Sequence, residues 1–200
     1  MALLELEKND IRGIIFDCDG TLVDTLSVHL DAWAVVFKKY GITTPISYLD
    51  KFNSCPSWFI AEDLLKLEGL DFDPNALADE KEALYFDNLK SAKVLENIVE
   101  YVKFYFKKMP MIVLSGGVSR GVKKSLEINN LSSYFDRIIG ADEEFPPKTE
   151  PASFVEVAKH FEIEPNNWVV FEDGDVGLEN ALLAGMKVVD VRKSPLIIEG

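Results

Sequence analysis

Short apolar runs alternate with segments of helical periodicity along this chain of 200 residues, and this alternation restricts its fold more than any other feature. Each run has the length of a buried strand, and the first four end in polar or small residues. Parallel strands need crossover connections, which are usually helical. We therefore predict an α/β fold with a doubly wound parallel sheet, in which the strands are 11–16, 109–114, 137–140, 168–171 and 186–191.

Helical segments are predicted between these strands at 28–40, 95–108, 118–129, 151–161 and 176–184. The connection between the first two strands is too long for a simple crossover. It contains two further helical patterns, 56–68 and 75–89, and no strand pattern. We therefore predict a small α-helical cap, residues 26–91, inserted into a core formed by residues 1–25 and 92–200.

The composition restricts the partners and the compartment. A net charge of −13 would repel nucleic acid and anionic membranes, and an anionic substrate would need a local cation or a bound metal. Apolar stretches such as 111–114 are far shorter than the roughly 20 residues of a membrane span, and residues 1–10 do not resemble a secretory signal. Two cysteines make no disulfide framework. We expect a cytoplasmic monomer or small homo-oligomer that binds neither nucleic acid nor membrane.

Two carboxylates follow the first predicted strand, at the edge where open parallel sheets bind ligands. Asp17 and Asp19 are two residues apart, so both can face one pocket. Their mutual repulsion needs a compensating cation, and Mg²⁺ prefers oxygen ligands. A solvated acidic turn is the alternative for an isolated Asp-x-Asp-Gly. A calcium loop fits less well, because residues 21–23 lack its further oxygen ligands.

Three further polar motifs follow the later strands. Ser115 and Gly116 form a strand-to-helix turn whose hydroxyl and backbone N–H groups can hold phosphate oxygens. Lys148 lies in a proline-rich loop, and Glu172 and Asp173 follow the fourth strand. Taken singly, the serine-glycine pair is a plain turn and the lysine is a surface residue. Their order at the ends of successive strands makes them a candidate site.

The four motifs resemble, in order, those of the haloacid dehalogenase-like (HAD) hydrolase superfamily; they are 16–24, 114–117, 147–151 and 171–177. The resemblance implies a Rossmann-like catalytic core in which Asp17 is the nucleophile and Asp19 is the general acid/base. It also implies that Lys148 neutralises charge between Asp17 and the phosphoryl group, which Ser115 and Gly116 help to bind.

The same resemblance implies a magnesium ion as cofactor. Its ligands would be Asp17, Asp173, the main-chain carbonyl of Asp19 and, directly or through water, Glu172. The third motif departs from the family pattern, since Thr149 replaces a proline and Ala152 an aspartate. Two helix N-caps are expected near these motifs, Ser153 for the helix at 151–161 and Asp175 for the helix at 176–184. A remote metal partner is the alternative for Asp175.

An ionised aspartate can attack phosphorus to form an aspartyl phosphate, and Asp19 can protonate the leaving oxygen and then activate water. Dehalogenases of the family lack the second aspartate, so Asp19 favours phosphoryl transfer. We expect the pKa of Asp19 to be raised in the closed site. The sequence is therefore interpreted as a Mg²⁺-dependent phosphatase that acts on a small phosphate monoester.

The cap resembles the β-phosphoglucomutase-like branch of the superfamily. His29 and Trp33 have the spacing of a histidine and a tryptophan in that branch, although core packing is the alternative for both. Loop 53–58 lacks the arginine with which the mutases grip the distal phosphate, and is more similar to the fructose-1-phosphatase-type members. Lys81 resembles a substrate-contacting lysine, with a solvated helix lysine as the alternative. Candidate substrate contacts are therefore His29, Trp58 and Lys81.

Several alternatives remain open at this stage. A β-phosphoglucomutase-type mutase is the nearest, and a phosphoglycolate or other non-sugar phosphatase would use the same core. A catalytically inactive binding module on the same fold is a different class, as is a phosphorylated receiver domain. Arg120, on the helix after the second motif, is a further candidate for phosphate contact.

Overall fold

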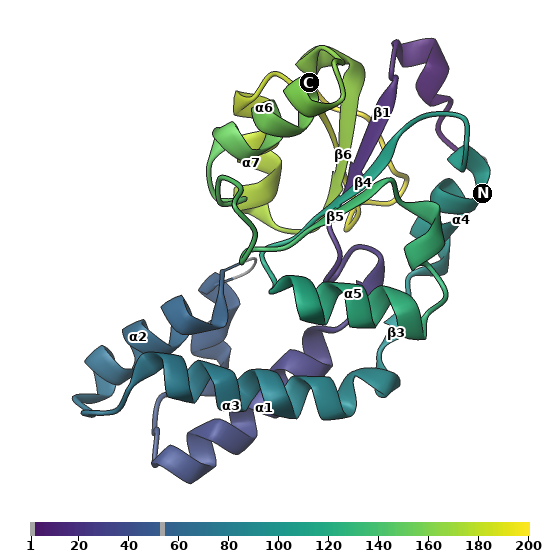
Figure 1. Ribbon diagram of the computed structural model, residues 1–200. Helices are drawn as coiled ribbons and strands as arrows, with labels where there is room; N and C mark the ends of the chain where they lie inside the picture. Colours follow the sequence, from purple (N-terminus) through teal and green to yellow (C-terminus); the bar gives the residue numbers. More distant parts are fainter. Residues whose placement is uncertain (1–2, 53–54) are drawn as a thin grey trace.

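The computed structural model describes residues 3–52 and 55–200 (Figure 1). Residues 53 and 54, which belong to the cap loop singled out in the sequence, lie outside the described residues. Five parallel strands form one sheet in the order β5-β4-β1-β6-β7. The strands are β1 (Gly13–Phe16), β4 (Met111–Leu114), β5 (Arg137–Ile139), β6 (Trp168–Glu172) and β7 (Lys187–Asp190).

Helices cover both faces of this sheet. They are α4 (Glu96–Tyr105), α5 (Ser119–Ile128), α6 (Pro151–His160) and α7 (Asp175–Leu183). Side chains of β1 alternate between two apolar clusters, because successive residues of a strand point to opposite faces. Ile14 and Phe16 pack in the cluster with α4 and α5, whereas Ile15 packs in the cluster with α6 and α7. The predicted doubly wound parallel sheet is confirmed.

Three helices form a separate layer beyond one edge of the sheet (Figure 1). These helices, α1 (Leu26–Tyr40), α2 (Ser57–Glu68) and α3 (Pro74–Asn88), share an apolar cluster of their own that includes Trp33, Leu64 and Leu77. Gly41 and Gly69 end α1 and α2 in the left-handed conformation, with φ of 69° and 67°. The division into a core of 1–25 and 92–200 and a cap of 26–91 stays a prediction.

The chain enters and leaves this helical layer through one short ribbon. Strand β2 (Val23–Asp24) pairs with β3 (Lys93–Val94) in antiparallel register, with Asp24 opposite Lys93. The sequence did not predict these two strands. Short 3₁₀ helices complete the described elements, at Leu6–Asn9, Ile46–Phe52, Leu89–Ser91, Ser132–Tyr134 and Pro165–Asn167.

Both predicted helix N-caps are wrong. Glu150 precedes α6, and Ser153 lies inside the helix, where its hydroxyl donates to the Glu150 carbonyl. Gly174 precedes α7, and Asp175 is the first helical residue. The Asp175 carboxylate instead accepts a hydrogen bond from Arg192 at 2.7 Å.

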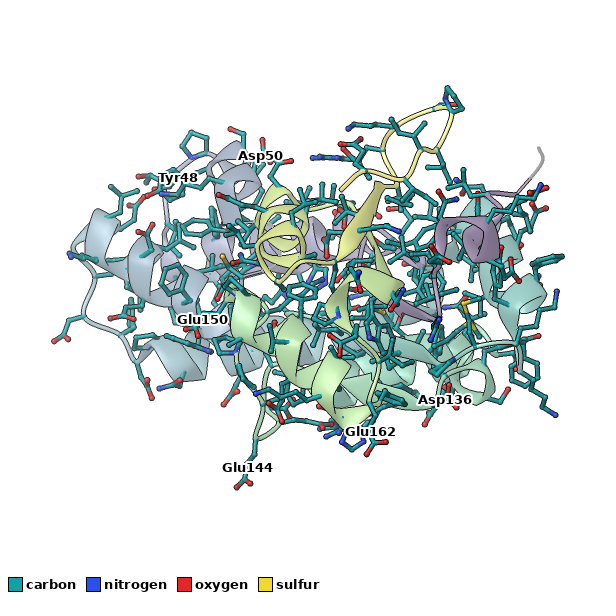
Figure 2. The ribbon with its side chains drawn as sticks, turned by 90° about the horizontal axis from the view of Figure 1, so that it is seen from above. Tyr48, Asp50, Asp136, Glu144, Glu150 and Glu162 are labelled. Carbon is teal, nitrogen blue, oxygen red and sulfur yellow. The ribbon has the colours of Figure 1, made fainter. Side chains whose placement is uncertain are left out.

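The surface of the molecule carries much of its acidic excess. In Figure 2 the labelled acids Glu144 and Glu162 lie at the periphery of the structure, and both are exposed, as is Glu150. Among the residues that the structure describes, no helix combines the length and the apolar character needed to cross a bilayer.

Candidate active site

The carboxyl ends of the sheet strands bring the predicted motifs to one edge. Asp17 follows β1, Ser115 follows β4, and Glu172 ends β6. Because the strands are parallel, these ends share one edge of the sheet. A cavity of about 340 Å³ lies between this edge and the helical layer, and both sides line it.

Lys148 joins two of the buried carboxylates. Its Nζ atom is 2.5 Å from Asp17 Oδ1 and 2.5 Å from Glu172 Oε2, and all three side chains are buried. Burial alone would lower the pKa of Lys148, but the charges of Asp17 and Glu172 outweigh it and raise that pKa. Lys148 is therefore a cation held beside the candidate nucleophile.

Three acidic side chains meet the requirements of a hard-cation site. Asp17, Glu172 and Asp173 each offer an oxygen atom, and these atoms lie within 4.8 Å of one another. Asp17 Oδ2 is buried, and it has no hydrogen-bond partner among the described residues. Oxygen-only donors with an unpartnered carboxylate atom suit Mg²⁺.

The charge balance of this cluster also favours a bound cation. Lys148 offsets only one of the three carboxylates. Burial, with a further contribution from Glu172, raises the pKa of Asp173 to about 6. Burial likewise raises the pKa of Asp17 well above its ordinary value, although Lys148 opposes this. All three carboxylates can be ionised together only when a further cation, besides Lys148, offsets their charge.

Gly20 allows Asp173 to approach the first motif. Its φ of +86° lies in the left-handed region, and a Cβ atom at this position would lie 2.3 Å from Asp173 Oδ2. Thr21, the next residue, donates its hydroxyl to Asp173 Oδ1 at 3.2 Å. The turn after β1 is therefore fitted to the carboxylate that follows β6.

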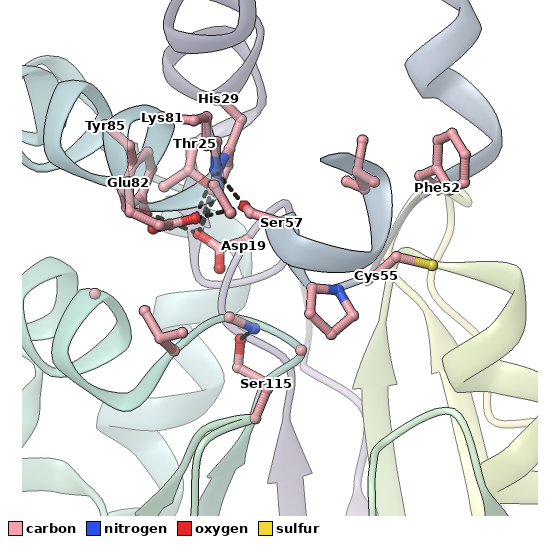
Figure 3. A pocket seen from close by; sticks show the side chains of 18 of the residues that line it. Asp19, Thr25, His29, Phe52, Cys55, Ser57, Lys81, Glu82, Tyr85 and Ser115 are labelled. Carbon is pink, nitrogen blue, oxygen red and sulfur yellow. Dashed lines mark hydrogen bonds and ion pairs between the residues drawn. The ribbon is translucent and has the colours of Figure 1, made fainter. Parts of the chain in front are cut away.

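Asp19 receives hydrogen bonds from the helical layer. Thr25 and Tyr85 donate their hydroxyl groups to its Oδ1 atom at 2.6 and 3.1 Å, and His29 Nε2 lies 3.6 Å away (Figure 3). Burial would raise the pKa of Asp19, but the His29 imidazole and the hydroxyl donors Thr25 and Tyr85 outweigh it. They lower the pKa to about 2. The expectation of a raised pKa is wrong for this state, because three groups stabilise the ionised form.

The turn after β4 has free space on its cavity side. Ser115 is buried, its N–H donates to the Ile139 carbonyl, and its Oγ atom accepts from Gly117 N at 3.0 Å. Ser115 and Gly116 both line the cavity. Arg120 does not line it, because its guanidinium lies over the Phe86 ring at 5.0 Å. A phosphate contact by Arg120 is therefore not supported.

The helical layer places all three candidate substrate residues in the wall of the cavity. His29, Trp58 and Lys81 line it, and Trp33 does so while packing in the apolar cluster of the cap. Lys81 is only 1% exposed, which excludes the alternative of a solvated helix lysine. Trp58 is half exposed at 50%.

Sequence reasoning missed several polar residues of this wall. Ser57 and Glu82 contact Lys81, Thr25 contacts Asp19, and the Tyr85 ring stacks on His29 with centroids 4.1 Å apart. The only available signal was spacing: Lys81 and Tyr85 are four residues apart and share a helix face.

The chain has clear similarity to known proteins. A family model described as "Haloacid dehalogenase-like hydrolase" matches residues 14–191. Fructose-1-phosphate phosphatase YqaB of Escherichia coli is 39% identical over 181 residues, which cover 90% of this chain and 96% of the relative. A phosphorylated carbohydrates phosphatase of Thermotoga maritima is 25% identical, with 88% of this chain and 83% of the relative covered.

Solved structures show the same fold. β-Phosphoglucomutase from Clostridium difficile matches with a TM-score of 0.75 at 22% identity, covering 89% of this chain and 83% of that one. At this identity the match shows a shared fold and no more.

Proposed function

The chain belongs to the haloacid dehalogenase-like hydrolase family, and we propose that it is a Mg²⁺-dependent phosphatase acting on a small phosphate monoester through an aspartyl phosphate on Asp17. The observation that carries this proposal is the arrangement around Asp17. Its buried carboxylate has one oxygen on Lys148 and the other without a partner among the described residues, at the end of a cavity of small-molecule size.

In the first step an Asp17 oxygen attacks phosphorus, and the bond between phosphorus and the ester oxygen breaks. Lys148 offsets the negative charge that opposes this attack, while Ser115 and the backbone at Gly116 are positioned to bind phosphoryl oxygens. Asp19 must be protonated for this step. The negative charge of a bound phosphate dianion favours its protonated form and opposes the groups that otherwise lower its pKa to about 2, and Asp19 then donates the proton to the leaving oxygen. The products of this step are an alcohol and an aspartyl phosphate.

In the second step Asp19, now ionised, takes a proton from water as the water attacks phosphorus. The bond between phosphorus and Asp17 then breaks, which releases inorganic phosphate and regenerates the carboxylate. The hydrogen bonds from Thr25 and Tyr85 stabilise the ionised Asp19 that this step needs. They also orient its carboxylate.

Asp17, Asp173 and the main-chain carbonyl of Asp19 would hold the magnesium ion, with Glu172 bound directly or through water. When bound, the ion supplies positive charge that offsets the repulsion between a phosphate dianion and the acidic cluster. The oxygen-only donor set and the unpartnered Asp17 Oδ2 support this assignment.

A sugar phosphate is the substrate class that we propose. The similarity to the E. coli fructose-1-phosphate phosphatase over most of both chains supports it, as does a cavity wall that mixes aromatic and polar side chains. His29, Trp58 and Lys81 would form part of the wall around the sugar. We further propose that the enzyme is cytoplasmic, a monomer or small homo-oligomer, with no nucleic-acid or membrane partner.

Phosphate release from a panel of esters tests the activity. The panel contains fructose 1-phosphate, β-glucose 1-phosphate and phosphoglycolate, each assayed with Mg²⁺ and with EDTA. We expect Mg²⁺-dependent release, fastest from a sugar phosphate. Formation of glucose 6-phosphate from β-glucose 1-phosphate with a bisphosphate primer, without phosphate release, would identify a mutase instead. Folded protein that is inactive in both assays would contradict the enzyme assignment.

A further inference from the structure

The cap wall of the cavity contains one buried cation whose hydrogen-bonding capacity is fully used by the protein. An ammonium group has three N–H donors. Lys81 Nζ lies 2.6 Å from His29 Nδ1, 2.9 Å from Glu82 Oε1 and 3.1 Å from Ser57 Oγ (Figure 3). Lys81 therefore has no donor left for a substrate group.

The contact between Lys81 and His29 also fixes the histidine tautomer. A lysine ammonium can only donate, so His29 Nδ1 accepts, and the ring proton of a neutral imidazole is then on Nε2. This nitrogen faces Asp19. Both nitrogens of His29 are thus directed at protein groups.

Glu82 cancels the charge of Lys81 at the cavity surface. Its Oε1 atom accepts from Lys81 and, at 2.5 Å, from the Ser57 hydroxyl. Glu82 is the partly exposed member of the pair, with 19% of its side chain accessible against 2% for Lys81. Its other oxygen, Oε2, accepts no hydrogen bond from the described residues, so the cavity meets an acceptor that carries negative charge.

No other positive side chain among the described residues of the cavity wall offsets the charge of Glu82. Of the described residues that line the cavity, Lys81 is the one lysine or arginine, whereas the cap side adds a second acid, Asp79. Lys148 contacts Asp17 instead, and in the proposed mechanism it offsets the charge of the reacting phosphoryl group. The cap side of the cavity therefore offers hydrogen-bond acceptors and apolar surface, and its described residues include no lysine or arginine with a free donor.

We propose that Glu82 is a specificity-determining residue that restricts this enzyme to phosphate esters whose distal end is uncharged and carries hydroxyl groups. This inference rests on the proposed phosphatase function. A hydroxyl can donate to Glu82 Oε2, whereas a second phosphate or a carboxylate would meet a like charge without a compensating cation. Such a repulsive element is a common source of specificity.

The test compares two esters that differ by one distal phosphate. kcat and KM are measured for fructose 1-phosphate and fructose 1,6-bisphosphate, with fructose and fructose 6-phosphate followed as the products. We expect the wild type to prefer the monophosphate by at least about tenfold in kcat/KM, since like charges in a partly buried site repel strongly. Glu82→Gln should narrow this ratio by about fivefold or more, mainly by lowering the KM of the bisphosphate.

Two further variants distinguish an effect of charge at the cavity from a general effect on folding. Asp79→Asn removes the other cap-side acid from an exposed position, and should narrow the ratio in the same direction if Glu82→Gln does not fold. Glu62→Gln makes the same chemical change on an exposed residue of α2 outside the cavity, and should leave the ratio unchanged.

Three outcomes would overturn the inference while leaving the phosphatase proposal intact. These are a wild type that accepts both esters equally, a Glu82→Gln variant that loses kcat/KM equally for both, and a ratio that Glu62→Gln shifts as much as Glu82→Gln. By contrast, absence of phosphate release from every ester tested, in folded protein with Mg²⁺, would remove the proposed function itself.

Discussion

Two buried lysines lie on opposite sides of the cavity, and their surroundings differ. Lys148, on the sheet side, sits between the carboxylates of Asp17 and Glu172, with Asp173 nearby. Lys81, on the helical side, has a single carboxylate partner, Glu82, and two neutral ones. Burial lowers the pKa of Lys81 and one partner does not restore it, whereas two carboxylates raise the pKa of Lys148.

The difference separates two tasks within one cavity. The sheet side has an excess of negative charge, which a metal ion and Lys148 would balance when a phosphate dianion binds. On the cap side Glu82 offsets the charge of Lys81 and Asp79 adds a second acid, so this side can surround a substrate without attracting a second anion. Chemistry and substrate choice are thus assigned to different charge environments, and the following experiments test that assignment.

Replacing the proposed nucleophile should have the largest effect. Asp17→Asn should lower kcat by about 10⁴-fold or more, because a nucleophile cannot be replaced by binding alone. Phosphate release with the preferred ester measures this. Asp24→Asn, which changes an exposed aspartate of the same segment, is the matched control and should retain activity. Comparable losses in both variants would place the chemistry elsewhere.

Removing Lys148 should destabilise the folded protein more than removing Lys81. Lys148→Met leaves two buried carboxylates without their cation, which should lower the free energy of unfolding by about 3–5 kcal/mol. Lys81→Met leaves only Glu82 without its cation, and Glu82 is partly exposed to water. The loss in free energy of unfolding should therefore be about 1–2 kcal/mol smaller than for Lys148→Met. Urea unfolding in EDTA measures both values. Equal losses would show that the two lysines do not differ as described.

Magnesium should stabilise the folded protein through the acidic cluster on the sheet side, independently of the cap residues. At 100 times its dissociation constant, an ion that binds only the folded state adds about 2.7 kcal/mol to the free energy of unfolding. We expect Mg²⁺ to raise the thermal unfolding midpoint of the wild type, and of Glu82→Gln by the same amount. Asp173→Asn should abolish the rise. An unchanged midpoint together with full activity in EDTA would argue against the metal site.

Tyr85→Phe should have the smallest effect and tests how far the cap reaches into the chemistry. The change removes the hydroxyl that donates to Asp19 but keeps the ring stacked on His29. Loss of one hydrogen bond to a charged acceptor should lower kcat by about tenfold, with little change in KM. A variant with a raised KM and normal kcat would instead assign Tyr85 to substrate binding.

The sequence predicted the sheet side well because its signals are local. Asp17, Ser115 and Glu172 each end an apolar strand, and a parallel sheet brings such ends to one edge whatever the details of packing. Lys148 lies on a loop, but its motif could be placed by its order in the chain. The catalytic and metal roles of these residues stay predictions.

The cap side could not be predicted in the same way. The contacts of Lys81 with His29 and Ser57 span 52 and 24 residues and depend on how three helices cross. The pKa of Asp19 shows how contacts of this kind change a prediction. The role of Asp19 as proton donor suggested a raised pKa, whereas Thr25, His29 and Tyr85 lower it. A helix pattern shows which residues share a face, but it does not show which face of a neighbour they meet.

The ribbon formed by β2 and β3 brings the two chain connections to the cap side by side. Asp24 and Lys93 face each other across paired backbones, so the chain leaves the core and returns to it at almost the same point. Such a pair of ends can be closed by a two-residue hairpin turn, leaving the sheet and its connections intact. Helical modules from relatives could be exchanged at this junction, and those that keep the donors to Asp19 would allow substrate range to be engineered while the reaction is retained.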